Sequence, residues 1–115
     1  RDLTYVSDTV DGFLRAGGTP DVEGQTFNLG ANEEISIGDL AQKIIRLVGR
    51  PVEVVTDPQR LRPNRSEVLR LWSDNRKAKQ CLNWQPQMSL EAGLQNTIEW
   101  IAAHLDRYQI GQYTV

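Results

Sequence analysis

The chain has 115 residues, a formal net charge of −2 and 24% charged residues. This length suits one domain with a modest core rather than two. The charge argues against nucleic acid as a general partner, because no excess of positive charge is present to displace counterions. No apolar run approaches the length of a membrane span, so we expect no membrane partner. A single cysteine, Cys81, fits a reducing compartment, which predicts a cytoplasmic protein, and Cys81 with the lone His104 leaves no ligand set for Zn²⁺.

The first third of the chain predicts a strand, a helix and a second strand. Asp2–Val6 alternates and contains Thr, Tyr and Val, as a short strand would. Ser7 or Asp8 then offers an N-cap, and Gly17-Gly18 supplies a left-handed stop. Thr26–Leu29 is a second short strand. The apolar positions between the cap and the stop predict one inner helix face: Val10, Phe13 and Leu14.

The next helix has the clearest pattern. Ser36 with Asp39 three residues later resembles a capping box. Gly49 and Pro51 end the helix, and Pro51–Val55 alternates as a strand. Strand, helix and strand in this order predict an α/β layer. The helical stripe consists of Ile37, Leu40, Ala41, Ile44, Ile45 and Val48.

Two further helices are expected towards the end of the chain. Asp74 caps a short one that runs through Leu82, and Ser89 caps a long one. The tail from Tyr108 is polar and predicted to fray. The inner faces are predicted as Ala78, Cys81 and Leu82 in the short helix and Leu90, Leu94, Ile98, Ile101 and Leu105 in the long one.

Residues 57–68 form the stretch with the strongest chemical signal. Pro58 and Pro63 favour an extended, stiff backbone there. Guanidinium groups offer planar forks of donors that suit phosphate, while the carboxylate of Glu67 could accept from the two hydroxyls of a sugar. A solvated loop with local ion pairs is the alternative interpretation. The cations are Arg60, Arg62 and Arg65, with Arg70 just beyond.

Catalytic signatures are absent from the sequence, with no glycine-rich phosphate loop and no nucleophile motif. His104 is expected as a structural or surface histidine, and Cys81 as a buried, inert thiol. Trp84 and Trp100 are predicted to pack in the core rather than stack on a base. Asp8 is interpreted as a helix cap rather than an acid catalyst.

Several collinear motifs carry a family resemblance. They are R-D-L-T-Y-V-S-D at 1–8, F-N-L-G at 27–30, I-S-I-G-D-L at 35–40, D-P-Q-R-L-R-P at 57–63 and S-E-V at 66–68, followed by the spaced pattern D-x-x-K-A, L-N-W-Q-P, L-E-A-G-L and T-I-E-W over 74–100. Together they resemble the extended short-chain dehydrogenase/reductase family, the NAD-dependent nucleotide-sugar epimerases and dehydratases. Asn83 stands where that family usually has Gly, and Leu3 stands where it has an aromatic residue.

The resemblance implies two domains with different roles. In such enzymes an N-terminal Rossmann domain binds NAD and carries a Tyr-x-x-x-Lys pair, while a smaller C-terminal lobe holds the nucleotide. Residues 1–115 resemble that lobe, as a piece of a longer protein. By family position Arg1 and Arg62 would contact the pyrophosphate and Glu67 the ribose, with Arg60 and Arg65 as less certain neighbours.

The expected fold is therefore α/β (mixed α+β), a small substrate-binding lobe with short strands and about four helices. The spacing of Arg-Pro-x-x-Ser-Glu-Val favours a 4,6-dehydratase as the parent enzyme. A 4-epimerase and a stand-alone, non-catalytic interaction module are the alternatives. We expect these 115 residues alone to be inactive, to bind a nucleotide sugar, and to expose an apolar patch towards the absent Rossmann domain that could drive self-association.

Overall fold

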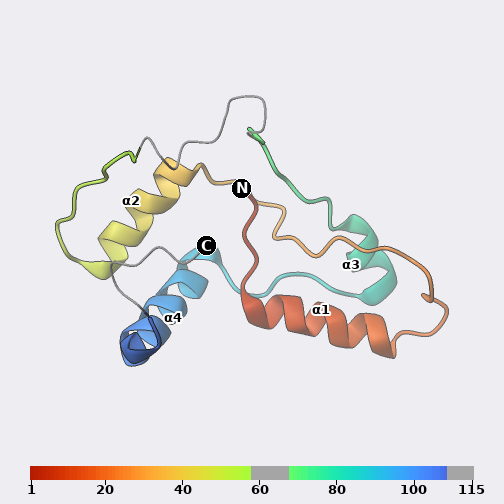
Figure 1. Cartoon of the computed structure of the whole chain (residues 1–115). Coiled ribbons are helices and arrows are strands. Elements are labelled where there is room, and N and C mark those ends of the chain that lie inside the picture. The colour runs from red at the N-terminus through yellow and green to blue at the C-terminus, as the bar shows by residue number, and fades with distance from the viewer. Residues whose placement is uncertain (58–67, 109–115) are drawn as a thin grey trace.

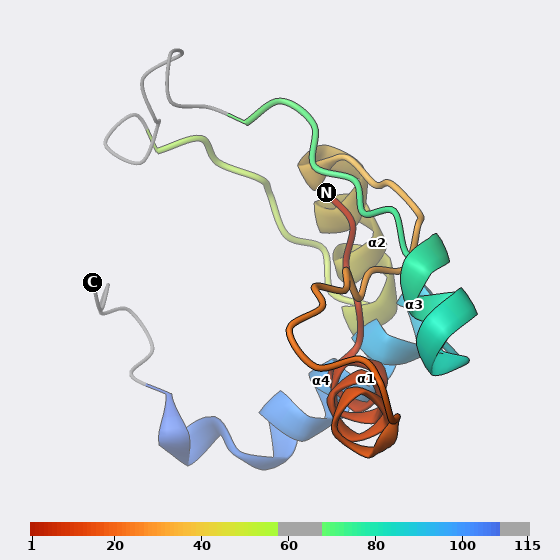
Figure 2. The ribbon, with the colours of Figure 1, turned by 90° about the vertical axis from the view of Figure 1, so that its right-hand side faces the viewer.

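A computed structural model describes residues 1–57 and 68–108 of the chain. Figure 1 and Figure 2 show its helices in two neighbouring groups, with α1 beside α3 and α2 beside α4. The number of helices agrees with the expected four. They are α1 (Val6–Gly18), α2 (Ile37–Val48), α3 (Arg76–Leu82) and α4 (Leu90–Ala103), followed by the short 3-10 turn η3 (Leu105–Arg107).

The expected mixed α/β fold is wrong, because residues 1–57 and 68–108 contain no strand. Asp2–Val6, Thr26–Leu29 and Pro51–Val55 alternate as predicted, yet a strand exists only where a second one pairs with it. Arg1 and Ile35 do exchange two main-chain hydrogen bonds, of 2.7 and 2.9 Å. That single pair does not extend into a ladder, and alternation in the sequence cannot reveal a missing partner.

The buried core lies between α1 and α3. Ala78 and Leu82 of α3 are buried, as predicted, and Trp84 is fully buried behind them. The indole Nε1 of Trp84 donates to the main-chain oxygen of Asp8 in α1 over 2.9 Å. The core of the described residues is thus small, and one tryptophan fixes α1 to the turn that follows α3. Partly buried side chains complete it: Ala16, Val22, Phe27 and Leu29.

The caps of α2 and α4 confirm the sequence-based prediction. The Ser36 hydroxyl accepts from the amide of Asp39 over 3.0 Å and donates to its carboxylate over 2.7 Å. The hydroxyl of Ser89 accepts from the amide of Ala92 over 3.2 Å. Gly49 ends α2 with φ +69°, a left-handed conformation that glycine adopts without steric cost. Hydroxyl N-caps are worth about 1 kcal/mol each.

The predicted ends of α1 are wrong. Its N-cap is Tyr5, without a side-chain hydrogen bond, so neither Ser7 nor Asp8 caps it. Asp8 lies in the first turn and is buried, and its carboxylate accepts from the amide of Met88 over 3.0 Å. Gly17-Gly18 remains helical, and the helix gives way to an extended Thr19. The pattern indicated a helix correctly but could not show that Asp8 turns towards a distant segment.

The inner face predicted for α1 is uncovered. Val10, Phe13 and Leu14 are 51%, 70% and 72% exposed, and Val6, one turn earlier, is 65% exposed. Four large apolar side chains on one face of a helix are normally covered in a stable protein. Periodicity identifies such a face without saying whether its cover belongs to the same 115 residues.

Three further predictions concern the region from α3 to the end of α4. Cys81 is exposed rather than buried, and Trp100 is 47% exposed rather than in the core. Trp100 instead stacks on His104, with ring centroids 4.3 Å apart. Asn83 adopts φ +49° as the C-cap of α3, so the left-handed turn is retained without the usual glycine.

The start of α3 also differs in detail. Its N-cap is Asn75 rather than Asp74, although the Asp74 carboxylate accepts from the amide of Arg76 over 3.1 Å. None of the helices within residues 1–57 and 68–108 has the length and apolar character of a membrane span.

Candidate functional site

Most of the predicted binding residues fall on a segment that the structure does not describe. Arg60, Arg62, Arg65 and Glu67 all lie within residues 58–67, outside the described ranges. Arg1 is the one predicted site residue that is placed. The geometry therefore bears on Arg1 and on the two ends of the arginine-rich stretch, and the roles of the other four residues stay predictions.

The guanidinium group of Arg1 lies at the downstream end of that stretch. Its Nη1 donates to the main-chain oxygen of Val68 over 2.6 Å. The main chain of Arg1 is fixed independently, through its paired hydrogen bonds with Ile35. A cation 67 residues upstream in sequence thus reaches the point where the chain leaves residues 58–67.

Asp2 joins its own segment to two others, residues 31–32 and Ser73. One carboxylate oxygen accepts from the amide of Ala31 over 2.8 Å. The other accepts from the amides of Asn32 and Ser73, over 3.0 and 3.1 Å. A carboxylate that accepts several amide hydrogen bonds holds its neighbours firmly, because hydrogen bonds to a charged group are the stronger kind. We call Asp2 with these three residues the Asp2 junction.

Gly30 allows the segments of the Asp2 junction to approach each other. The residue is buried, and a Cβ added there would lie 2.2 Å from the Cβ of Ser73 and 3.0 Å from a carboxylate oxygen of Asp2. Any side chain would force these segments apart. The side-chain amide of Asn75 also donates to the main-chain oxygen of Gly30 over 2.8 Å. Residues 73–75 are therefore tied to residues 30–32 at two points.

A charged pair links the same two segments closer to the arginine-rich stretch. The guanidinium of Arg70 donates through two nitrogens to the two carboxylate oxygens of Glu34. These hydrogen bonds lower the pKa of Glu34 and raise that of Arg70. The guanidinium also lies 5.5 Å from the ring centre of Trp72. Arg70 is thus engaged with a carboxylate, which makes it a structural cation rather than an open anion-binding group.

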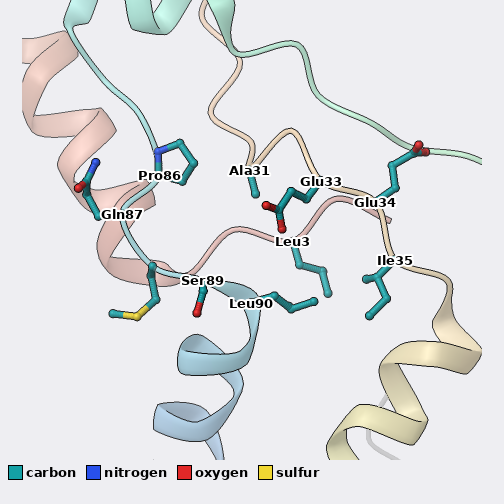
Figure 3. Close-up of a pocket in the computed structure, with 10 residues that line it drawn as sticks. Leu3, Ala31, Glu33, Glu34, Ile35, Pro86, Gln87, Ser89 and Leu90 are labelled. Carbon is teal, nitrogen blue, oxygen red and sulfur yellow. The ribbon is translucent and has the colours of Figure 1, made fainter.

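A hollow of about 330 Å³ lies beside this region, and Figure 3 shows the side chains that line it. In Figure 3 the side chains of Leu3 and Leu90 point towards each other, while Glu34 extends away from them. The charged side chains of the hollow, Glu33 and Glu34, are both acidic. Glu34 is already paired with Arg70, and none of the described residues that line the hollow is basic, so they offer a diphosphate no cation.

Sequence reasoning missed the residues that hold Arg1 in place. Asp2 stands beside Arg1 in the R-D motif, but only the fold brings the amides of Ala31, Asn32 and Ser73 to its carboxylate. The pairing of Glu34 with Arg70 spans 36 residues and leaves no local signature. One signal in the sequence was available, namely the aspartate directly after Arg1. A carboxylate next to a proposed anion site needs hydrogen-bond donors of its own, which would have indicated a structural role for Asp2.

The described residues show no metal-binding cluster. Residues 1–57 and 68–108 contain no group of three or more His, Cys, Asp or Glu placed to hold a metal. Dinucleotides bind where a glycine-rich turn leads from a strand into a helix with open amides. In α2 and α4 a first-turn amide is instead bonded to Ser36 and Ser89, respectively. Neither α2 nor α4 therefore begins with that arrangement.

Comparison with known proteins places the chain in a family. Residues 1–97 match the family model described as GDP-mannose 4,6 dehydratase. The chain is 42% identical over 100 residues to a UDP-glucose 4-epimerase of Mycolicibacterium smegmatis, covering 87% of the chain and 30% of that protein.

Two solved structures have the same fold over this region. One is the UDP-glucose 4-epimerase of Thermotoga maritima with UDP-glucose, which has 32% identity and a TM-score of 0.80 and matches 91% of this chain and 32% of that one. The other is the WbmF enzyme of Bordetella bronchiseptica in complex with NAD+ and UDP, which has 28% identity and a TM-score of 0.75, covering 92% of this chain and 30% of that one. The chain spans about a third of the length of these relatives. It belongs to the NAD-dependent nucleotide-sugar epimerase/dehydratase family.

Proposed function

We propose that the chain is the nucleotide-holding part of a nucleotide-sugar 4-epimerase. The observation that carries this proposal is the 42% identity to a UDP-glucose 4-epimerase over 87% of the chain. The position of Arg1 supports the nucleotide-holding role, because its guanidinium brings a cation to Val68, where the chain leaves the arginine-rich stretch. This revises the preference for a 4,6-dehydratase, which depended on residues that would hold the nucleotide in either enzyme.

The proposed role of this chain is binding and orientation. Arg1 and Arg62 would hold the two phosphates, Glu67 would accept from the ribose, and Arg60 and Arg65 would add positive charge nearby. Binding energy from these remote contacts would place the hexose against groups supplied by other residues of a longer chain. NAD would supply the hydride chemistry there. The 115 residues alone should therefore bind nucleotide without turnover.

A calorimetric titration with UDP tests the binding role. Arg62→Ala should weaken binding by about 1.5–3 kcal/mol, the usual worth of a hydrogen bond to a charged group. Arg46→Ala is the matched control, because Arg46 is exposed on α2 and its loss changes the net charge equally. Binding should also weaken as salt rises, since exposed charges are screened. Equal dissociation constants for Arg62→Ala and the unaltered chain would remove Arg62 from the site.

The reaction type needs a separate experiment. A 4,6-dehydratase is the second candidate, favoured by the description of the matching family model. The chain would be produced together with a Rossmann domain and given UDP-glucose and NAD. UDP-galactose is the expected product of an epimerase, whereas a 4-keto-6-deoxy sugar would establish the dehydratase. Turnover of UDP-glucose by the 115 residues alone would contradict the proposed division of roles.

A further inference from the structure

We propose that Asp2 is a positioning residue for nucleotide diphosphate binding, and that it acts through Arg1. This inference depends on the proposed function and adds to it a residue that touches no ligand. The Asp2 junction fixes the main chain next to Arg1, while the guanidinium of Arg1 reaches Val68. The same carboxylate holds Ser73, five residues beyond Val68.

The geometry couples Arg1 to the segment that begins at Val68. Through Ala31 and Asn32, Asp2 holds Arg1 against the segment that precedes α2. Through Ser73 it holds the segment that leaves the arginine-rich stretch. One carboxylate thereby sets the distance between Arg1 and the start of residues 68–73. Side chains held in this way lose less freedom when a ligand binds.

A positioning role and a plain charge effect of Asp2 predict opposite changes in diphosphate affinity. Asp2 lies next to Arg1 and is negatively charged, so its removal should strengthen the attraction of this region for a diphosphate. A positioning role predicts weaker binding, because an amide in place of the carboxylate turns an NH₂ group towards a main-chain N–H. Asp2→Asn therefore separates the two interpretations. Asp11→Asn is the matched control, since it removes the same charge from a half-buried α1 residue that pairs with Arg15.

The first measurement is UDP binding by the 115-residue chain in a double-mutant cycle. We expect Asp2→Asn to raise the dissociation constant about tenfold, and Asp11→Asn to leave it unchanged or lower it. In the Arg1→Ala background, Asp2→Asn should have little further effect, because the two residues act as one unit. UDP binding of Asp2→Asn equal to that of the unaltered chain, or an equal loss in both backgrounds, would overturn the proposal.

A second measurement reports on the junction without any ligand. Hydrogen exchange at the Ser73 amide should accelerate in Asp2→Asn, while the Met88 amide, which donates to Asp8, should stay protected. Unchanged Ser73 exchange would overturn the proposal even if binding falls. If the unaltered chain binds no UDP, the proposed function fails and the positioning role falls with it, although the exchange data still show whether the junction forms.

A milder variant covers the case in which Asp2→Asn does not fold, as judged from its helical circular dichroism. Asn75→Ala removes the hydrogen bond to the main-chain oxygen of Gly30 and leaves every carboxylate in place. No cap is lost, because the Asn75 side chain makes no capping hydrogen bond to α3. Asn75→Ala should raise the dissociation constant for UDP by a smaller factor than Asp2→Asn does. An unchanged dissociation constant would count against the proposal.

Discussion

Replacing Trp84 by phenylalanine tests whether the described core depends on one side chain. The indole is fully buried and donates to the main-chain oxygen of Asp8. Loss of that hydrogen bond should cost about 1 kcal/mol, since the helical carbonyl keeps its acceptor role within α1. Phenylalanine also lacks about three heavy atoms of the indole, worth about 2 kcal/mol of burial. The expected total is about 3 kcal/mol.

The assay is urea unfolding of the 115-residue chain, followed by far-ultraviolet circular dichroism. Trp100→Phe is the matched control, because the same atoms are removed at a site that is 47% exposed. It should lower the free energy of unfolding by less than about 1 kcal/mol. Equal losses for the two variants would refute the reasoning, because burial and the Asp8 contact would then not matter. Complete loss of helical signal in Trp84→Phe alone would support it.

Two other predictions concern charge and the uncovered helix face. The carboxylate of Asp74 accepts from the side chain and amide of Arg76, which lowers its pKa from 3.8 to about 2. The stabilising effect of ionised Asp74 is therefore complete above about pH 4 and is lost as the pH falls through about 2. Arg76→Gln should raise the pKa of Asp74, as measured by carbon NMR. An unchanged pKa would exclude this pair as the cause. The 115 residues should associate as concentration rises, and Phe13→Asp should shift sedimentation towards the monomer, because Phe13 is 70% exposed on an apolar face. A monomer at high concentration in the unaltered chain would contradict that expectation.

Local chemistry predicted the helices well. Ser36, Ser89 and Gly49 each act on the residues beside them, so their roles can be recognised from sequence alone. The burial of Ala78 and Leu82 also followed from helical spacing. These predictions succeeded because a helix cap and an apolar helix face depend only on residues within one or two helical turns.

The failures share a physical cause, which is dependence on distant groups. The alternation in Pro51–Val55 predicted a strand, but no partner for it exists among the described residues. Asp8 was assigned to its own helix, whereas the fold turns it towards Met88, 80 residues away. Cys81 and Trp100 occupy apolar helix positions whose cover the sequence could not locate.

The arrangement of the candidate site could not be predicted from the sequence, and its anion-binding role stays a prediction. The arginine-rich stretch indicated anion binding, yet the roles of Arg62 and Glu67 lie outside what the structure describes. For Arg1, the sequence suggested a phosphate contact without its structural neighbour Val68. The junction around Asp2 depends on three amides that come together only in the folded chain.

The exposed position of Cys81 has a practical consequence. It is the sole cysteine of these 115 residues, so a disulfide formed between such chains joins two copies through Cys81. Such covalent dimers would sediment like non-covalent ones and could be mistaken for association through α1. The same thiol offers a unique attachment point for a fluorescent dye on α3, next to the tryptophan core, from which loosening of the α1–α3 contact could be followed.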